Sequence, residues 1–508
     1  MIFQKAAVIA PSICDFYFTP QRAAALGAIS VQNQLLKCGV ETDFFNMPLF
    51  NSRGKTIPLP DTHNYLEKYL LKGERGALSF FTQYKRFGPS PDESAELILQ
   101  SKAEIIFISL FAWTYGEDAI QLAKSIRKKE TDLQKTILCI GGPGVAVLPE
   151  YFQNTKLFDF IITGDAEETI APLLTELSRV NCDLSKIPHL FGFGQRATEI
   201  SQSAPEPVVS YSKDKKGNQW LSVILSRGCP LRCRFCSNFL TQGRVFRSTS
   251  LEELEKELID LPADKTGKIH INLEDDNLLV KKSYFTEALQ LMKRIFPRST
   301  FSIDNGLDYS NMTNDYIDFL IDSGFSQFTL SLGSSDLNTL KEEKRPGNLR
   351  KFEKTLEYLK KKMIPATTFL ICGLPEDNAE TILCSLLYLH KLSTDIGISL
   401  FYPVPGLPRF NDKNLFLEKS TRLCSGSSAY PWGNSLTTKE MVTSFRLARL
   451  SNLMNKGDKS KEEYELIDRI KTTGKLHSFV GKEKRNIEIP HMEESLVTGF
   501  LNNYLIDI

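Results

Sequence analysis

The sequence predicts an α/β protein with two parallel-sheet units in series, followed by a mainly helical carboxy-terminal region. Short apolar runs alternate with amphipathic helical segments from residue 1 to about residue 175, and the same alternation resumes at residue 220. This alternation is typical of parallel strands joined by crossover helices. The chain has 508 residues, of which 42% are apolar, and it can therefore bury about two or three hydrophobic cores.

The first unit, residues 1–197, is predicted to be a flavodoxin-like doubly wound domain. Its strand candidates are residues 6–10, 40–45, 104–109, 136–140 and 158–163. A ligand of such a domain is expected beyond the carboxyl ends of its strands. The polar, Lys-rich stretch 198–219 is predicted to be a linker or a short hairpin.

The second unit, residues 220–406, is predicted to be a partial (β/α)6 barrel, because six strand candidates are too few for a closed eight-stranded barrel. These candidates are residues 221–225, 268–273, 300–303, 327–332, 366–371 and 396–401, with helical patterns such as 251–258 and 349–359 between them. Residues 407–508 are predicted to be mainly helical and to line a substrate pocket. Tyr402 and the segment Tyr430-Pro-Trp-Gly433 are candidates for its wall, although aromatics beside Pro and Gly also pack loops.

Composition and charge narrow the function classes. A formal net charge of +1 gives no electrostatic footprint for nucleic acid. The first residues lack the apolar core and cleavage site of a signal peptide, and no apolar stretch approaches the ~18 residues of a membrane span. We therefore expect a cytoplasmic enzyme that binds neither nucleic acid nor, through a span, a membrane.

Three cysteines, Cys229, Cys233 and Cys236, have the spacing Cys-x3-Cys-x2-Cys. A structural zinc site usually needs a fourth ligand from a second Cys or His pair, and none accompanies this motif. A disulfide framework does not fit ten cysteines in 508 residues, because the other seven are scattered singly. A 4Fe-4S cluster is usually held by four thiolates. Three thiolates alone therefore predict a cluster with one open iron.

This segment resembles the signature of the radical SAM superfamily. Phe235 stands before the third cysteine, where that family places an aromatic residue, and the strand candidate 221–225 precedes the loop. Gly228 and Pro230 suit a tight loop around a cluster. The resemblance implies that S-adenosylmethionine (SAM) binds the open iron and is cleaved to a deoxyadenosyl radical.

Several strand ends in the second unit match the weaker SAM-binding motifs of that family. Asp275 or Asp276 stands where a carboxylate holds the methionine ammonium group, and residues 371–376 preserve an Ile-x-Gly-x-x-Glu motif. In contrast, Gly333 and Ser334 replace a glutamate that many relatives have. A carboxylate or a Gly-Pro turn at a strand end also occurs for structural reasons. The resemblance implies SAM contacts from Phe235, Asp275, Asp276, Asp304, Ser331, Ser334, Ile371, Gly373 and Glu376.

The first unit resembles the cobalamin-binding domain of the cobalamin-dependent, class B radical SAM methyltransferases. Residues 108–114, 140–146 and 162–168 stand where that family has a Ser-containing strand end, a Gly-Gly pair and a Gly-Glu-Gly-Glu segment. Glycines there let the backbone approach the nucleotide tail of the corrin. The resemblance implies contacts from Ser109, Leu110, Phe111, Trp113, Gly141, Gly142, Gly144, Gly164, Asp165 and Glu167. The alternatives are a different cofactor with a similar tail, or a sheet that binds none.

Many cobalamin domains carry Asp-x-His-x-x-Gly after the first strand, and its imidazole ligates cobalt. Here the corresponding stretch, residues 22–27, keeps Gly27 but has neither Asp nor His. His63 and His189 lie in segments that look like loops and are predicted to be solvated. We therefore expect no histidine ligand on the cobalt.

The resemblance implies a SAM- and cobalamin-dependent radical methyltransferase. It would methylate an unactivated carbon, less often phosphorus, of a small-molecule substrate through methylcobalamin, with electrons from a donor such as flavodoxin or ferredoxin. Radical hydrogen abstraction needs no acid or base, so no catalytic residue is assigned beyond the cluster and SAM. One alternative is a cyclase or rearrangement enzyme with the same cofactors. Another is a non-catalytic cobalamin sensor or carrier.

Overall fold

The computed structural model describes residues 3–19, 24–131, 135–193, 200–433 and 435–505. The amino-terminal domain is built on a parallel five-stranded sheet with the strand order β3-β1-β7-β8-β9. These strands are β1 (Lys5–Ala10), β3 (Glu41–Asn46), β7 (Ile105–Ser109), β8 (Ile137–Gly141) and β9 (Phe160–Ile162). This is the flavodoxin-like order that the sequence predicts.

Helices cover both faces of this sheet because its central strands are apolar on both sides. In β1, Ala6 and Val8 join the core under α1 (Leu26–Lys37) and α7 (Ala166–Leu177), whereas Ala7 and Ile9 join the opposite core. That second core is covered by α3 (Pro91–Gln100) and α4 (Gly116–Lys129), with the short helices α5 (Pro143–Ala146) and α6 (Pro149–Gln153). Alternate residues of one strand thus fill two cores.

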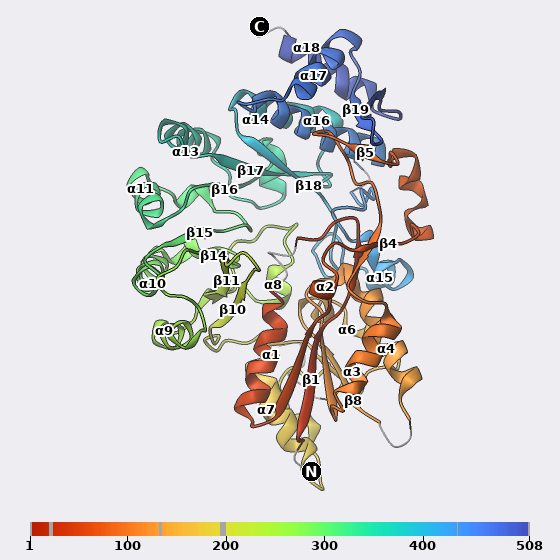
Figure 1. Cartoon of the computed structure of the whole chain (residues 1–508), viewed down its shortest axis with the longest axis vertical. Coiled ribbons are helices and arrows are strands. Elements are labelled where there is room, and N and C mark those ends of the chain that lie inside the picture. Colours follow the sequence, from red (N-terminus) through yellow and green to blue (C-terminus); the bar gives the residue numbers. More distant parts are fainter. Residues whose placement is uncertain (1–2, 20–23, 132–134, 194–199, 434, 506–508) are drawn as a thin grey trace.

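Residues 47–90 form an excursion from the amino-terminal domain that rises to the carboxy-terminal helices (Figure 1). It contains α2 (Met47–Phe50), β4 (Lys55–Thr56), the 3-10 helix η2 (Asp61–Tyr69), β5 (Glu74–Arg75) and β6 (Lys85–Phe87). β6 pairs with β4 and with β2 (Ile13–Asp15), whereas β5 pairs with β19 (His477–Val480). The excursion therefore links segments far apart in the sequence.

The second domain is a partial barrel of six parallel strands in two sheets. β11 (Gln219–Ile224), β14 (Ile269–Leu273) and β15 (Ser299–Ser302) form the first, and β16 (Phe328–Gly333), β17 (Ala366–Cys372) and β18 (Asp395–Leu400) form the second. Only isolated bridges, Phe301 to Phe325 and Leu307 to Leu330, are found between them in the described residues. The outer helices are α9 (Leu251–Asp260), α10 (Lys282–Ile295), α11 (Asn314–Ser323), α12 (Leu337–Glu342), α13 (Leu349–Lys361) and α14 (Ala379–Lys391).

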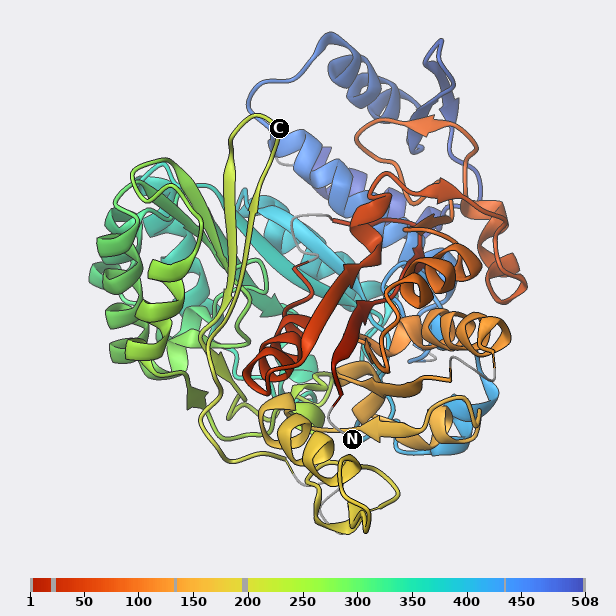
Figure 2. The ribbon, with the colours of Figure 1, turned by 60° about the horizontal axis from the view of Figure 1, so that its bottom comes forward.

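Residues 208–219 contribute a strand to the barrel. β10 (Val208–Lys213) pairs antiparallel with β11, and the two form a hairpin beside α1 (Figure 2). The α/β fold class and the partial barrel predicted from the sequence are both confirmed.

The carboxy-terminal region is mainly helical, as predicted, but contains an unpredicted hairpin of β19 and β20 (Arg485–Glu488). Its helices are α15 (Lys413–Glu418), α16 (Thr438–Asn455), α17 (Lys461–Thr473) and α18 (Glu494–Leu505). α16 packs on β18, and the core of the barrel continues into this region and into the excursion. Within the described residues, no helix has both the length and the apolar composition required to cross a membrane.

Candidate active site

A loop of residues 228–246, which we call the cysteine loop, carries all three clustered cysteines. Its base is the antiparallel pair β12 (Ser226–Arg227) and β13 (Arg247–Ser248), directly after β11. Gly228 closes the base with φ 86°, and a Cβ there would lie 2.2 Å from the Val245 carbonyl oxygen. Only glycine fits at this position, where two backbone segments approach closely. The short helix α8 (Asn238–Thr241) lies within the loop.

The three cysteines line one cavity of about 340 Å³, which we call the cysteine cavity. Cys233 is buried, whereas Cys236 is exposed to the cavity space. Surrounding protein atoms keep water from the three thiols and so raise the pKa of each, that of Cys236 to about 12. The thiols therefore stay protonated until a metal displaces their protons. The remaining lining residues are Leu231, Phe235, Asn238, Phe239, Asp276, Asn277, Asn305, Gly306, Asp308, Ser331, Gly333, Arg345, Phe369, Ile371 and Ser399.

The donor set fits an iron–sulfur cluster better than a single ion. Among the described residues, no three His, Cys, Asp or Glu side chains are arranged to hold one metal ion. A four-iron cluster spreads its thiolates over separate irons, so it needs three thiols around a space rather than at one point. The cysteine cavity offers this arrangement.

Four of the predicted SAM contacts line the cysteine cavity: Phe235, Asp276, Ser331 and Ile371. Burial raises the pKa of Asp276 to about 6, and a hydrogen bond with Asn238 opposes this shift. The carboxylate is thus ionised at neutral pH and faces a space next to the cysteines. It is placed to accept hydrogen bonds from a cationic ligand group.

The other five predicted SAM contacts are not part of this lining. Asp275 is 2% exposed, accepts from the Leu225 amide and from Ser226 Oγ at 2.6 Å, and thereby ties β14 to the end of β11. Ser334 Oγ accepts from the Asp336 amide at 3.1 Å, and Gly373 donates to Asp377. Glu376 pairs with Arg409 Nη1 at 2.8 Å. Asp304 lies beside the lining residue Asn305.

Arg345 is a cavity residue that the sequence did not indicate. Its Nη2 donates to the Ser331 carbonyl at 2.7 Å, and its Nη1 lies 3.9 Å from Cys233 Sγ. It follows α12 in a segment without periodic pattern or motif, and packing alone brings it to the cysteines. A fixed guanidinium there offers a cation to a ligand carboxylate or to the cluster.

A second cavity, of about 200 Å³, lies at the carboxyl ends of the amino-terminal strands, and we call it the strand-end cavity. Six predicted cobalamin contacts line it: Ser109, Phe111, Gly141, Gly142, Gly164 and Asp165. Gly142 has φ 104°, and a Cβ there would lie 2.6 Å from the Leu110 carbonyl oxygen. The predicted Gly-Gly pair thus permits a close backbone approach.

The other four predicted cobalamin contacts do not line the strand-end cavity and instead contact neighbouring protein residues. Leu110 is fully buried, and Trp113 is 3% exposed with its ring edge-on to Tyr151 at a centroid distance of 5.0 Å. A Cβ on Gly144 would lie 2.6 Å from the Ala112 carbonyl carbon. Glu167 pairs with Arg227.

From the sequence, we did not assign the cavity-lining residues that come from α1, from the cysteine loop and its base, or from β10 and β11, where they are Val208 and Ile224. Leu26, Gly27, Ser30 and Val31 come from α1, and Arg227, Thr241 and Gln242 come from the cysteine loop and its base. The order of the strand ends along the sequence gives no signal for residues that a neighbouring element contributes. The cysteine loop therefore borders both cavities.

The prediction that His63 and His189 are solvated is wrong. His63 is 1% exposed among Phe16, Tyr65 and Tyr84, and burial lowers its pKa to about 4. His189 is 3% exposed, and its Nε2 lies 2.9 Å from Glu168 Oε2. His63, in η2, is buried by aromatic packing, and His189 is buried beside an acidic partner.

The stretch in place of the Asp-x-His-x-x-Gly motif lies partly outside the described residues, at 22 and 23. Gly27, which it retains, lies in α1 and lines the strand-end cavity. That no histidine ligates cobalt stays a prediction.

The aromatic residues predicted for a substrate wall divide between the surface and the core. Tyr402 is 41% exposed. Trp432 is 7% exposed and donates its Nε1–H to the Leu423 carbonyl at 2.9 Å. Tyr430 packs edge-on against Tyr65. Only Tyr402 retains the exposure that a wall residue needs.

Residues 223–386 match the family model described as the radical SAM superfamily. The chain is 24% identical over 205 residues to bacteriochlorophyllide d C-12(1)-methyltransferase of Chlorobaculum tepidum, covering 39% of this chain and 43% of that protein. It is 27% identical over 340 residues to cytidylyl-2-hydroxyethylphosphonate methyltransferase of Streptomyces wedmorensis, covering 58% and 62%. The chain thus spans less than two thirds of either relative.

Among solved structures, the radical S-adenosylmethionine methyltransferase TsrM of Kitasatospora setae, with cobalamin and a 4Fe-4S cluster bound, has a similar fold. The TM-score is 0.56 at 12% identity, over 80% of this chain and 77% of TsrM. Residues 223–386 include the cysteine loop and four of the six barrel strands that follow or flank it. Residues 223–386 therefore form a domain that matches the radical SAM superfamily, and the fold of the chain is similar to that of TsrM.

Proposed function

We propose that this protein is a radical SAM methyltransferase that uses cobalamin to methylate an unactivated carbon of a small molecule. One observation carries the proposal: the loop that holds the three cysteines also borders the strand-end cavity, through Thr241 and Gln242. Methyl transfer by a radical requires a cluster site and a corrin site close to one substrate. A shared loop brings the two sites together.

The cysteine cavity suits a cluster with SAM on its open iron. Cys229, Cys233 and Cys236 would hold three irons, and Asp276 would accept hydrogen bonds from the methionine ammonium group. Arg345 would pair with the carboxylate group, and Phe235 would pack against the adenine. When bound, the cluster and SAM supply a carbon radical that removes a substrate hydrogen atom.

The strand-end cavity suits the nucleotide tail of cobalamin. Gly27, Gly141 and Gly142 leave room where side chains would fill the space, and Val31, Ile162 and Ile170 give it an apolar lining. An apolar slot with a few polar groups is typical of cofactor sites. When bound, cobalamin supplies the methyl group.

The two curated relatives suggest what kind of atom is methylated. One is named as a methyltransferase at a carbon of a bacteriochlorophyllide, and the other is named for a phosphonate. We place carbon first and phosphorus second. An external low-potential donor, such as flavodoxin or ferredoxin, would reduce the cluster.

The test is an anaerobic assay of protein reconstituted with iron, sulfide and hydroxocobalamin. With SAM, a reductant and a panel of small molecules, the true substrate should gain the mass of a methyl group while 5′-deoxyadenosine and S-adenosylhomocysteine appear together. Deoxyadenosine without a mass gain would favour a cyclase or rearrangement enzyme. Reconstituted protein that cleaves no SAM would contradict an enzymatic role.

Gly27→Leu is expected to block the strand-end cavity. A Cβ at Gly27 would lie 3.5 Å from Ser109 Oγ, an ordinary contact, but a leucine side chain would extend into the space beyond. Overpacking costs about 1–3 kcal/mol, which corresponds to roughly a 5- to 150-fold loss of hydroxocobalamin affinity. The measurement is an absorbance titration. Gly27→Ala, which fits the space, is the matched control and should bind like the wild type; equal affinity of both variants would place cobalamin elsewhere.

Asp276→Asn is expected to weaken SAM binding about 10- to 100-fold, since hydrogen bonds to charged groups are worth about 1.5–3 kcal/mol. The cluster-loaded protein would be titrated with SAM in equilibrium dialysis. Asp304→Asn is the control, because Asp304 is not part of the cavity lining. If Asp304→Asn weakened binding and Asp276→Asn did not, the assignment of the carboxylate would be reversed.

A further inference from the structure

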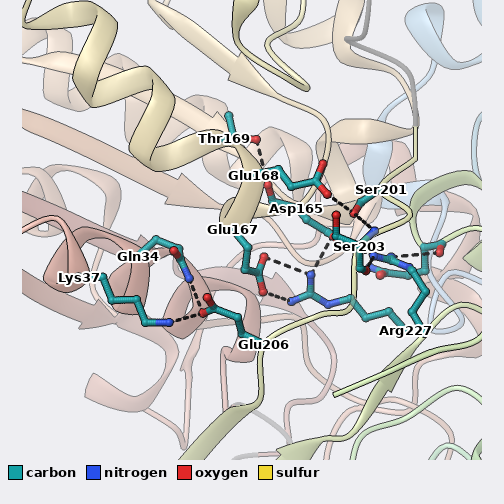
Figure 3. Close-up of polar contacts among 12 residues, drawn as sticks. Gln34, Lys37, Asp165, Glu167, Glu168, Thr169, Ser201, Ser203, Glu206 and Arg227 are labelled. Carbon is teal, nitrogen blue, oxygen red and sulfur yellow. Dashed lines mark hydrogen bonds and ion pairs between the residues drawn. The ribbon is translucent and has the colours of Figure 1, made fainter. Parts of the chain in front are cut away.

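Asp165, the N-cap residue of α7, and Glu167, in the first turn of α7, contact the base of the cysteine loop. Arg227 Nη1 lies 2.9 Å from Asp165 Oδ1, and its Nη2 lies 2.7 Å from Glu167 Oε1 (Figure 3). Arg247 Nη1 lies 3.0 Å from Asp165 Oδ2. Asp165 therefore bridges two guanidinium groups from directly opposite positions of the β12–β13 pair.

All four charged side chains are largely buried, with exposures between 4% and 13%. Like charges on directly opposed residues of a strand pair repel, and more strongly away from water. Burial alone would lower the pKa of Arg227, but Glu167 and Asp165 outweigh burial and raise it. The two arginines thus depend on carboxylates that another domain supplies.

This four-residue group, which we call the charge bridge, borders the strand-end cavity and holds the base of the cysteine loop. Arg227 directly precedes Gly228 and Cys229, so it fixes the start of the cysteine loop. Asp165 and Arg227, which contact each other, both line the strand-end cavity. A ligand in that cavity would touch both halves of the charge bridge.

We propose that Asp165 and Glu167 are positioning residues that couple cobalamin binding to retention of the cluster. Cobalamin in the strand-end cavity would hold the start of α7, the start of α7 would hold Arg227 and Arg247, and the arginines would hold the base of the cysteine loop. The inference rests on the proposed function, because it requires cobalamin in this cavity. Coupling between binding sites is reciprocal, so each cofactor should stabilise the other by the same factor.

The experiment uses the full chain, reconstituted anaerobically with ferrous iron and sulfide, and two measurements. The first is the concentration of a ferrous chelator that removes half of the cluster iron at equilibrium, with and without saturating hydroxocobalamin. The second is the dissociation constant of hydroxocobalamin with and without the cluster. In the wild type, we expect each cofactor to favour the other by about fivefold or more. In Asp165→Asn and in Glu167→Gln, this factor should fall towards one.

Glu96→Gln is the matched control, because it removes an ion pair with Lys129 elsewhere in the same domain. It should keep the full factor, and Arg227→Lys, which retains the charge, should keep part of it. If Asp165→Asn does not fold, Glu167→Gln decides, since Asp165 still compensates Arg227 in that variant. If the ion pairs were merely structural, the carboxylate variants would change the dissociation constant of hydroxocobalamin equally with and without the cluster, and the ratio of the two values would stay the same.

Three results are decisive. A factor that is unchanged in both carboxylate variants would overturn the coupling. A wild type that binds both cofactors independently would also overturn it, while leaving the proposed function intact. A wild type that binds a cluster but no hydroxocobalamin would instead refute the cobalamin part of the proposed function.

Discussion

Cys233→Ala should leave a folded protein that holds no complete cluster and releases no 5′-deoxyadenosine from SAM above the level of iron-free protein. Cys233 is buried beside Arg345 and lines the cysteine cavity with Cys229 and Cys236. A cluster with one iron open for SAM has three thiolates to hold it, and loss of one leaves two. Iron and sulfide analysis, visible absorbance and deoxyadenosine release would measure the loss.

Cys384→Ala is the control for this experiment. Cys384 is exposed on α14 and is not among the residues that line the cysteine cavity. Its removal should leave iron content and SAM cleavage unchanged. SAM cleavage by Cys233→Ala at the wild-type rate would contradict the site assignment as a whole.

Arg446→Met should destabilise the protein by about 3–5 kcal/mol, because it would leave a buried carboxylate unpaired. Arg446 and Glu74 both have fully buried side chains, joined by contacts of 2.5 and 3.1 Å. Arg446 also donates to the carbonyls of Leu78 and Tyr69. The measurement is the urea midpoint and the apparent Tm.

Lys475→Met is the matched control, since it breaks an ion pair with Glu488 in which both side chains are about half exposed. Exposed pairs contribute about 0–1 kcal/mol, so this variant should unfold almost like the wild type. Adding Glu74→Leu to Arg446→Met should recover part of the stability, because no unpaired charge then remains buried. Equal stability of Arg446→Met and the wild type would show that the pair is not needed.

The strands could be predicted from the sequence because each is a short apolar run with polar turns around it. β7 and β8 are central parallel strands, and their continuous burial gives the clearest pattern. The β19–β20 hairpin was missed because its exposed residues, such as Arg485 and Glu488, carry no apolar alternation. It is defined by pairing with β5, which is remote in the sequence.

The residues of the candidate site that belong to a sequence motif could be predicted. Those that only tertiary packing brings to the site could not. The spacing of the cysteines and the glycines at strand ends identify two cavities. The sequence left Asp275 and Asp276 as alternatives, and the structure separates them: Asp275 ties two strand ends together, whereas Asp276 faces the cavity. Arg345 reaches the cysteine cavity only through tertiary structure, and no local pattern marks it.

The pairing of β5 with β19, and of Glu74 with Arg446, also bears on how the chain acquires its structure. Glu74 finds its partner 372 residues later in the sequence. Bringing together the ends of so long a segment costs conformational entropy before any stabilising contact forms, and contacts between distant residues slow folding. During synthesis, the surface of the excursion that α16 covers in the folded protein therefore stays exposed until α16 has left the ribosome. Until then it is a segment that chaperones are expected to bind.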